Sequence, residues 1–95
     1  MADTLRFVIY SRSYCHLCDD LRQALQARLG GRAADIEMVD VDADAGLVAR
    51  YDELVPVLMA QQRDGQWLQL CHYFLDESRL QAFIDGFDAP GADAR

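Results

Sequence analysis

The stretch Tyr14-Cys15-His16-Leu17-Cys18 decides the fold, because it sets two cysteines three residues apart between an apolar run and a helical pattern. On the first turn of a helix, positions i and i+3 lie on one face with their Cβ atoms about 5–6 Å apart. Small adjustments bring two sulfur atoms from that spacing to bonding distance. The helix start also directs unpaired N–H groups and the positive end of the helix dipole at the first sulfur, which favours the reactive thiolate. We therefore predict Cys15 as an exposed nucleophile and Cys18, one turn further in, as the resolving thiol.

Composition sets the class of protein in which this pair acts. The chain has 95 residues, 52% of them hydrophobic, so it forms one domain that can bury a core without disulfide staples. Three cysteines are too few and odd in number for a disulfide scaffold, so the paired cysteines indicate redox chemistry or metal binding. The N-terminus lacks the basic and apolar regions of a signal peptide, and no apolar run is long enough to span a membrane. We expect a monomer in the reducing cytoplasm, with no membrane partner.

Charge argues against nucleic acid as a partner. The formal net charge is −7, and all nine basic residues are arginine. An acidic chain without a basic cluster repels phosphate backbones. We therefore expect no nucleic-acid binding.

The first half of the chain has the pattern of a strand, a helix and a second strand. The segment of residues 5–10 is short and rich in β-branched and aromatic side chains, which is typical of a buried strand. An amphipathic helix is predicted over residues 16–29, with Ser13 as its cap and glycines after it. Residues 35–41 read as the second strand. Such a unit favours parallel pairing with a right-handed crossover.

The second half continues with a short helix, a hairpin and a final helix. Asp42 or Asp44 can cap the short helix, and residues 54–59 form an apolar run interrupted by Pro56. A turn at residues 63–65 leads to a fourth strand over residues 66–72, antiparallel to the third because the connection is short.

The last helix is marked by its capping residue and its apolar stripe. Asp76 is its predicted cap, and an i, i+3, i+4, i+7 stripe follows it at Leu80, Phe83, Ile84 and Phe87. We expect a single ordered domain over about residues 4–87 and a disordered tail over residues 88–95. Trp67, Phe83 and Phe87 are predicted to lie in the core.

The order β-α-β-α-β-β-α, with paired cysteines after the first strand and Val55-Pro56 before the third, resembles the thioredoxin fold. Residues 10–18 look most like glutaredoxins, in which a basic residue three before the first cysteine is usual, and Arg12 holds that place. The resemblance implies an α/β, thioredoxin-like domain: a four-stranded mixed sheet of order 2-1-3-4, with three helices on both faces. It also implies a cis peptide at Pro56 that leaves the Val55 backbone to pair with an extended substrate.

This sequence departs from the glutaredoxin pattern in two places. His16-Leu17 stands between the cysteines where Pro-Tyr is usual, and residues 71–76 lack the Gly-Gly pair that helps hold the glutathione carboxylate. The chain looks more like a short bacterial glutaredoxin-like branch, and we expect Asp76 of this chain to keep part of that role.

The function that the resemblance implies is thiol–disulfide exchange. The substrates would be protein or glutathione mixed disulfides, and a reductase or glutathione would be the electron donor. No bound cofactor is expected, with glutathione as a co-substrate. The expected site residues are Cys15 and Cys18 for catalysis, and Arg12, Tyr14, His16, Val55, Pro56 and Asp76 for substrate binding.

Two alternatives keep the same fold. One is a redox-sensing or binding module whose cysteines respond once to redox state. The other is a cysteine-ligated metal or iron–sulfur protein, either from Cys15, Cys18, Cys71 and His72 or from a cluster bridging two chains through Cys15. Successive strand residues point to opposite faces, so Cys71 and His72 could not easily ligate one ion, and no metal site is predicted. Cys71, late in the fourth strand, is expected to be buried and inert.

Overall fold

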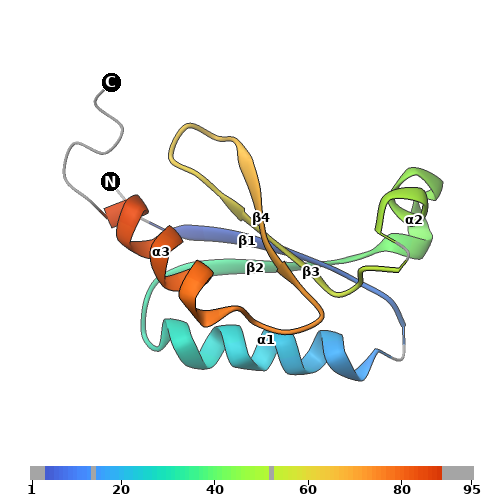
Figure 1. Ribbon diagram of the computed structural model, residues 1–95, viewed down its shortest axis with the longest axis horizontal. Coiled ribbons are helices and arrows are strands. Elements are labelled where there is room, and N and C mark those ends of the chain that lie inside the picture. The colour runs from blue at the N-terminus through green and yellow to red at the C-terminus, as the bar shows by residue number, and fades with distance from the viewer. Residues whose placement is uncertain (1–3, 14, 52, 89–95) are drawn as a thin grey trace.

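The computed structural model describes residues 4–13, 15–51 and 53–88 (Figure 1). Within these residues the chain forms β1 (Leu5–Ser11), α1 (His16–Leu29), β2 (Ala34–Asp40), a short 3₁₀ turn (Val41–Ala43), α2 (Ala45–Tyr51), β3 (Val57–Gln61), β4 (Trp67–His72) and α3 (Glu77–Asp88). The predicted order of elements is confirmed, and the bounds of α1 are those predicted from the sequence.

The strands form one mixed sheet. Their order is β2-β1-β3-β4, with β1 parallel to β2 and antiparallel to β3, and with β4 antiparallel to β3. This is the sheet predicted for a thioredoxin-like fold. Because β1 is central, the loop that follows its last residue, Ser11, leaves the middle of one edge of the sheet.

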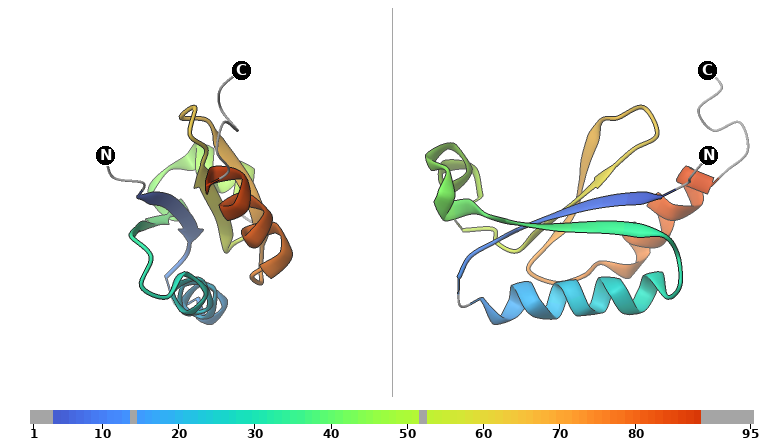
Figure 2. Two further views of the ribbon diagram at one scale, coloured as in Figure 1. Left: turned by 90° about the vertical axis from the view of Figure 1, so that its left-hand side faces the viewer. Right: turned by 180° about the vertical axis from the view of Figure 1, so that it is seen from behind.

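The main core lies between the sheet and two helices. In β1 the alternating residues Leu5, Phe7 and Ile9 are at most 1% exposed. They pack against the apolar stripe of α1 and, through Phe83, against α3. Figure 2 shows α1 and α3 on the same side of the sheet, with α2 displaced toward the end of the sheet at which β1 stops.

A smaller cluster holds α2 against the other face of the sheet. Tyr51 of α2 stacks on Tyr10 of β1, with ring centroids 4.6 Å apart. Val41 and Val57 are fully buried in the same cluster. Helices therefore cover both faces, as predicted, but α2 reaches only the end of its face.

The prediction that Trp67 belongs to the core is wrong. Its side chain is 45% exposed, and it lines a surface hollow with Arg6 and Glu37. Trp67 pairs with Gln61 at the start of β4, on the face that α1 and α3 do not cover. By contrast Phe83 is buried, as predicted.

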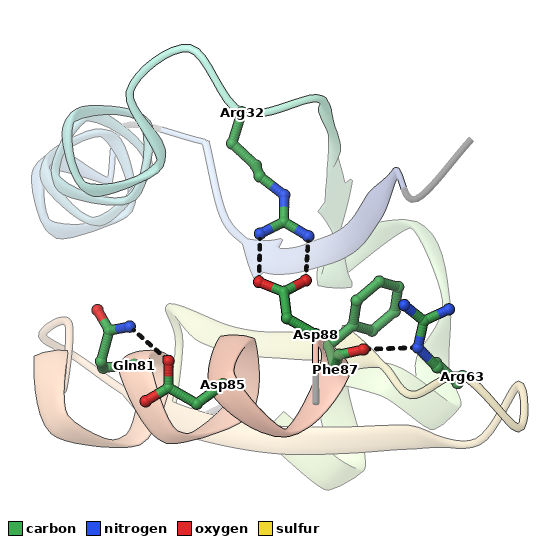
Figure 3. A network of polar contacts seen from close by, with 6 residues as sticks. All are labelled: Arg32, Arg63, Gln81, Asp85, Phe87 and Asp88. Atoms are coloured by element: carbon green, nitrogen blue, oxygen red, sulfur yellow. Dashed lines mark hydrogen bonds and ion pairs between the residues drawn. The ribbon is translucent and has the colours of Figure 1, made fainter. Parts of the chain in front are cut away.

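Two arginines form hydrogen bonds with the C-terminal end of α3 (Figure 3). The Arg32 guanidinium donates to both carboxylate oxygens of Asp88, at 2.8 and 2.6 Å, and this hydrogen bonding holds the pKa of Asp88 below its usual value. Arg63 donates from Nε to the Phe87 carbonyl at 2.5 Å and lies over the Phe87 ring. Cations suit this place because the last carbonyls of a helix are negative.

Asp88 therefore belongs to α3 and not to the predicted tail, whose remaining residues, 89–95, lie outside the described part of the chain. Among the helices of that described part, none has the length and apolar character needed to cross a membrane.

We expect Phe83→Ala to lower the free energy of unfolding by about 3–5 kcal/mol, because it leaves a cavity between β1 and α3. Trp67→Ala should cost about 1 kcal/mol or less, since nearly half of the side chain already contacts water. Urea unfolding of the two variants measures this difference. Equal losses would contradict the assignment of Trp67 to the surface.

Candidate active site

Cys15 and Cys18 form a disulfide at the start of α1. Their Cα atoms are 5.3 Å apart. Cys15 itself caps the helix: its backbone is extended, and its Sγ accepts a hydrogen bond from the Cys18 N–H at 3.1 Å. The cap predicted at Ser13 is therefore wrong, since the helix begins one residue after Cys15 and only the Cys15 side chain can reach the first free N–H groups.

The two sulfurs differ in their access to solvent. Cys18 is 2% exposed, packed beneath the first turn of α1, whereas Cys15 is half-buried. An incoming disulfide can reach Cys15 without movement of the core. The difference in burial matches the roles that the sequence suggested for the two residues.

A cavity of about 320 Å³ opens beside the disulfide. The residues that line it come from the end of β1, the first turn of α1 and the middle of β2: Ser11, Arg12, Cys15, His16, Cys18, Asp19 and Met38. The fold thus brings Arg12 and His16 to the cysteines, as predicted. Sequence reasoning missed Ser11 and Met38 as site residues; only their places on neighbouring parallel strands link them.

Arg12, which lines this cavity, also forms an ion pair with Asp42. Its guanidinium donates to Asp42 from Nη2 at 2.8 Å and from Nε at 3.3 Å. These hydrogen bonds hold the pKa of the Asp42 carboxyl below its ordinary value. Because Asp42 neutralises part of its charge, Arg12 is a weaker binder of anions than its position suggests.

The Val55–Pro56 peptide bond is cis, as the resemblance implied. The sheet register pairs Tyr10 with Val57, so Pro56 lies directly before the last pair of this ladder, close to the end of β1. The Val55 N–H donates to the Tyr51 carbonyl at 3.1 Å, because the chain is still leaving α2 there. The expectation that the Val55 backbone is left to pair with substrate is therefore wrong for its N–H.

The loop between β4 and α3 adjoins Pro56. Tyr73 donates its N–H to the Pro56 carbonyl at 2.8 Å and its hydroxyl to the Glu53 carbonyl. Asp76 accepts from the Arg79 N–H at 3.0 Å and so caps α3, as predicted; this use of its carboxylate competes with the predicted binding of substrate. Tyr14, the remaining predicted site residue, lies outside the described residues.

Cys71 is separated from the redox pair. It is 6% exposed and lies opposite Leu58 on the core side of the sheet. Burial raises the pKa of its thiol, and a hydrogen bond from the Asp76 backbone only partly opposes this. His72 beside it is exposed, so the two residues face different surroundings. In the described residues no group of three or more histidine, cysteine or carboxylate side chains is placed to hold a metal ion.

Comparison with known proteins identifies a family. A profile described as "Glutaredoxin-like domain (DUF836)" matches residues 6–85. Among curated proteins, none matches the chain significantly.

Solved structures show the same fold. A protein from Nitrosomonas europaea, determined by solution NMR, is 32% identical with a TM-score of 0.71, over 83% of this chain and 89% of that one. A structural-genomics target from X. campestris is 38% identical with a TM-score of 0.57, over 88% of this chain and 99% of that one. Oxidized mitochondrial thioredoxin 3 from Saccharomyces cerevisiae is 14% identical with a TM-score of 0.61, over 90% of this chain and 80% of that one, and this likeness concerns the fold alone.

Replacing Arg12 by glutamine should return the pKa of Asp42 toward its ordinary value of 3.8. A depressed carboxyl pKa in the folded state adds stability above the unfolded-state pKa, and that stability is lost as pH falls through the folded-state value. Arg12→Gln should therefore flatten the loss of stability below about pH 4.

Carboxyl NMR titration of the wild type and of Arg12→Gln measures the shift. Asp88, whose pKa is lowered by Arg32, serves as the internal control and should not move. An unchanged Asp42 titration would show that the ion pair does not persist in solution.

Proposed function

Because the chain belongs to the glutaredoxin-like domain family (DUF836), we propose that it is a thiol–disulfide oxidoreductase that uses Cys15 and Cys18. The observation that carries this proposal is the capped disulfide: an accessible sulfur at a helix start, bonded to a buried sulfur one turn away. This arrangement can open and close without rearrangement of the core.

The reaction proceeds by two exchanges. In the reduced protein the Cys15 thiolate attacks one sulfur of a substrate disulfide, a bond forms between the two sulfurs, and the other substrate sulfur leaves as a thiolate that takes a proton. The Cys18 thiolate then attacks Cys15 Sγ and releases the second substrate thiol. The substrate has gained two electrons, and the protein holds the Cys15–Cys18 disulfide. A thiol reductant returns it to the dithiol.

Local groups stabilise the attacking thiolate. The Cys18 N–H, 3.1 Å from Cys15 Sγ, is a donor aimed at the atom that carries the charge. A protonated His16 beside the cavity would add to this effect, whereas Asp19 on the first turn opposes it. The backbone donor acts at every pH, which makes it the more constant contribution.

The partners of this chemistry are also proposals. The substrates are protein or glutathione mixed disulfides, and a reductase or glutathione supplies the electrons. Arg12 and His16, which line the cavity beside Cys15 and Cys18, contact the incoming chain. The protein acts as a monomer in the cytoplasm and carries no resident cofactor.

Cys15→Ser should abolish exchange, while Cys18→Ser should still form mixed disulfides but release them slowly. The reason is that only Cys15 combines access with the donor at the helix start. Alkylation of the reduced protein as a function of pH, followed by peptide mapping, measures which thiol reacts first. First reaction at Cys18 would reverse the roles, and a single turnover with excess reductant would favour a sensor over an enzyme.

Cys71→Ala should leave turnover within about twofold of the wild type, because the buried thiol does not line the cavity. It should cost about 1 kcal/mol of stability. A Cys15–Cys71 bridge found by peptide mapping under mild oxidation would instead make Cys71 a second resolving thiol.

A further inference from the structure

The loop of residues 73–76, between β4 and α3, leaves the sheet at the same edge as the loop that leads to the redox pair. At this edge Ser11 follows Tyr10, which pairs with Val57, and the Pro56 carbonyl directly before Val57 accepts the Tyr73 N–H. Two strand spacings separate Ser11 from Tyr73, which is about 10 Å. Ser11 also lines the cavity at Cys15. Figure 2 shows this loop on the side of the sheet that α1 covers.

The backbone of this loop has little left to offer an anionic ligand. The Tyr73 N–H donates to Pro56, the Phe74 N–H donates to the His72 carbonyl at 2.7 Å, and the Asp76 backbone hydrogen-bonds to Cys71. A carboxylate held by backbone N–H groups needs donors that point outward. The N–H groups of Tyr73 and Phe74 instead donate to backbone carbonyls of the protein itself.

The loop instead presents apolar surface. Phe74 is 68% exposed, the largest exposure among the large hydrophobic residues of the described chain, and Tyr73 is 38% exposed. Leu17, between the two cysteines, is also 38% exposed. Exposed apolar groups at the same edge of the sheet as a reactive sulfur are typical of a docking surface.

The charges around this surface are mainly negative. Asp19 and Asp20 on α1 and Asp76 and Glu77 at the start of α3 are all exposed. Of the cations, Arg12 is bonded to Asp42, and Arg79 lies in the first turn of α3, where Asp76 and Glu77 offset its charge. Glutathione carries a net negative charge. The negative charges around this surface therefore disfavour the binding of glutathione and favour a positively charged partner.

We propose that Phe74 and Leu17 are specificity-determining residues of the Cys15–Cys18 site, and that they select an apolar, positively charged polypeptide segment carrying the disulfide in place of glutathione. This inference rests on the proposed function. The segment lies over Leu17 and Phe74 while its disulfide reaches Cys15, and the exchange itself is the one written above.

The test uses the full reduced chain and four probes, each a mixed disulfide with thionitrobenzoate. Attack by Cys15 breaks the probe's S–S bond, joins Cys15 to the probe's other sulfur and releases the coloured thionitrobenzoate thiolate with the bonding electron pair. Two probes are peptides with one cysteine, flanked by leucine and arginine or by serine and glutamate. The third is glutathione, and the fourth is mercaptoethanol, which has neither charge nor apolar flanks.

We expect the leucine–arginine peptide to react about tenfold faster than the glutathione probe, with the preference falling as salt is raised. In Phe74→Ala, the rate with this peptide divided by the rate with the mercaptoethanol probe should fall about tenfold. Leu68→Ala is the matched control, because Leu68 is 40% exposed near the opposite end of β4, and it should leave all rates unchanged.

The outcomes separate the two proposals. No reaction with mercaptoethanol would overturn the proposed function itself. Reaction with mercaptoethanol but equal rates for peptides and glutathione, or an unchanged ratio in Phe74→Ala, would overturn only the specificity. Self-association that Phe74→Ala abolishes would also overturn it, by assigning this surface to a second copy of the chain.

Discussion

The pairing of β1 on both sides is the constraint on which the site depends. Parallel hydrogen bonding to β2 and antiparallel hydrogen bonding to β3 fix the direction and the register of β1. The burial of Leu5, Phe7 and Ile9 fixes which face of the strand points to the helices. A shift of one residue would turn those side chains to the other face. The pairing of Tyr10 with Val57 also brings the end of β1, which leads to the cysteines, next to the start of β3.

The cap of α1 shows how function and local stability compete at this point. Oxygen side chains of serine, threonine, aspartate or asparagine are the usual acceptors at a helix start. Ser13 was available two residues earlier, yet the acceptor is the Cys15 sulfur, which is a weak acceptor when neutral. As a thiolate the same atom carries a charge and accepts more strongly. The N–H donor therefore stabilises the reduced, reactive form more than a neutral thiol.

Helices and strands whose apolar residues recur at a regular spacing could be predicted from the sequence. The bounds of α1 follow from its apolar spacing and its terminal glycines, and Asp76 caps α3 as its position indicated. Trp67 was wrongly assigned because composition does not tell how far a helix extends over a sheet face, and α2 reaches only its end. The pairing of Arg12 with Asp42 joins residues thirty positions apart, so no local pattern reveals it.

The turn after β4 shows how one backbone shape can serve different ligands. Tyr73 has a φ of 65°, in the left-handed region that glycine adopts at little cost and other residues rarely adopt. Its N–H bond to Pro56 and its hydroxyl bond to Glu53 hold it there. With a glycine pair the same turn could bring bare backbone up to a ligand. With Tyr73 and Phe74 the backbone donors face inward and the outer surface is aromatic, so the ligand has to meet side chains.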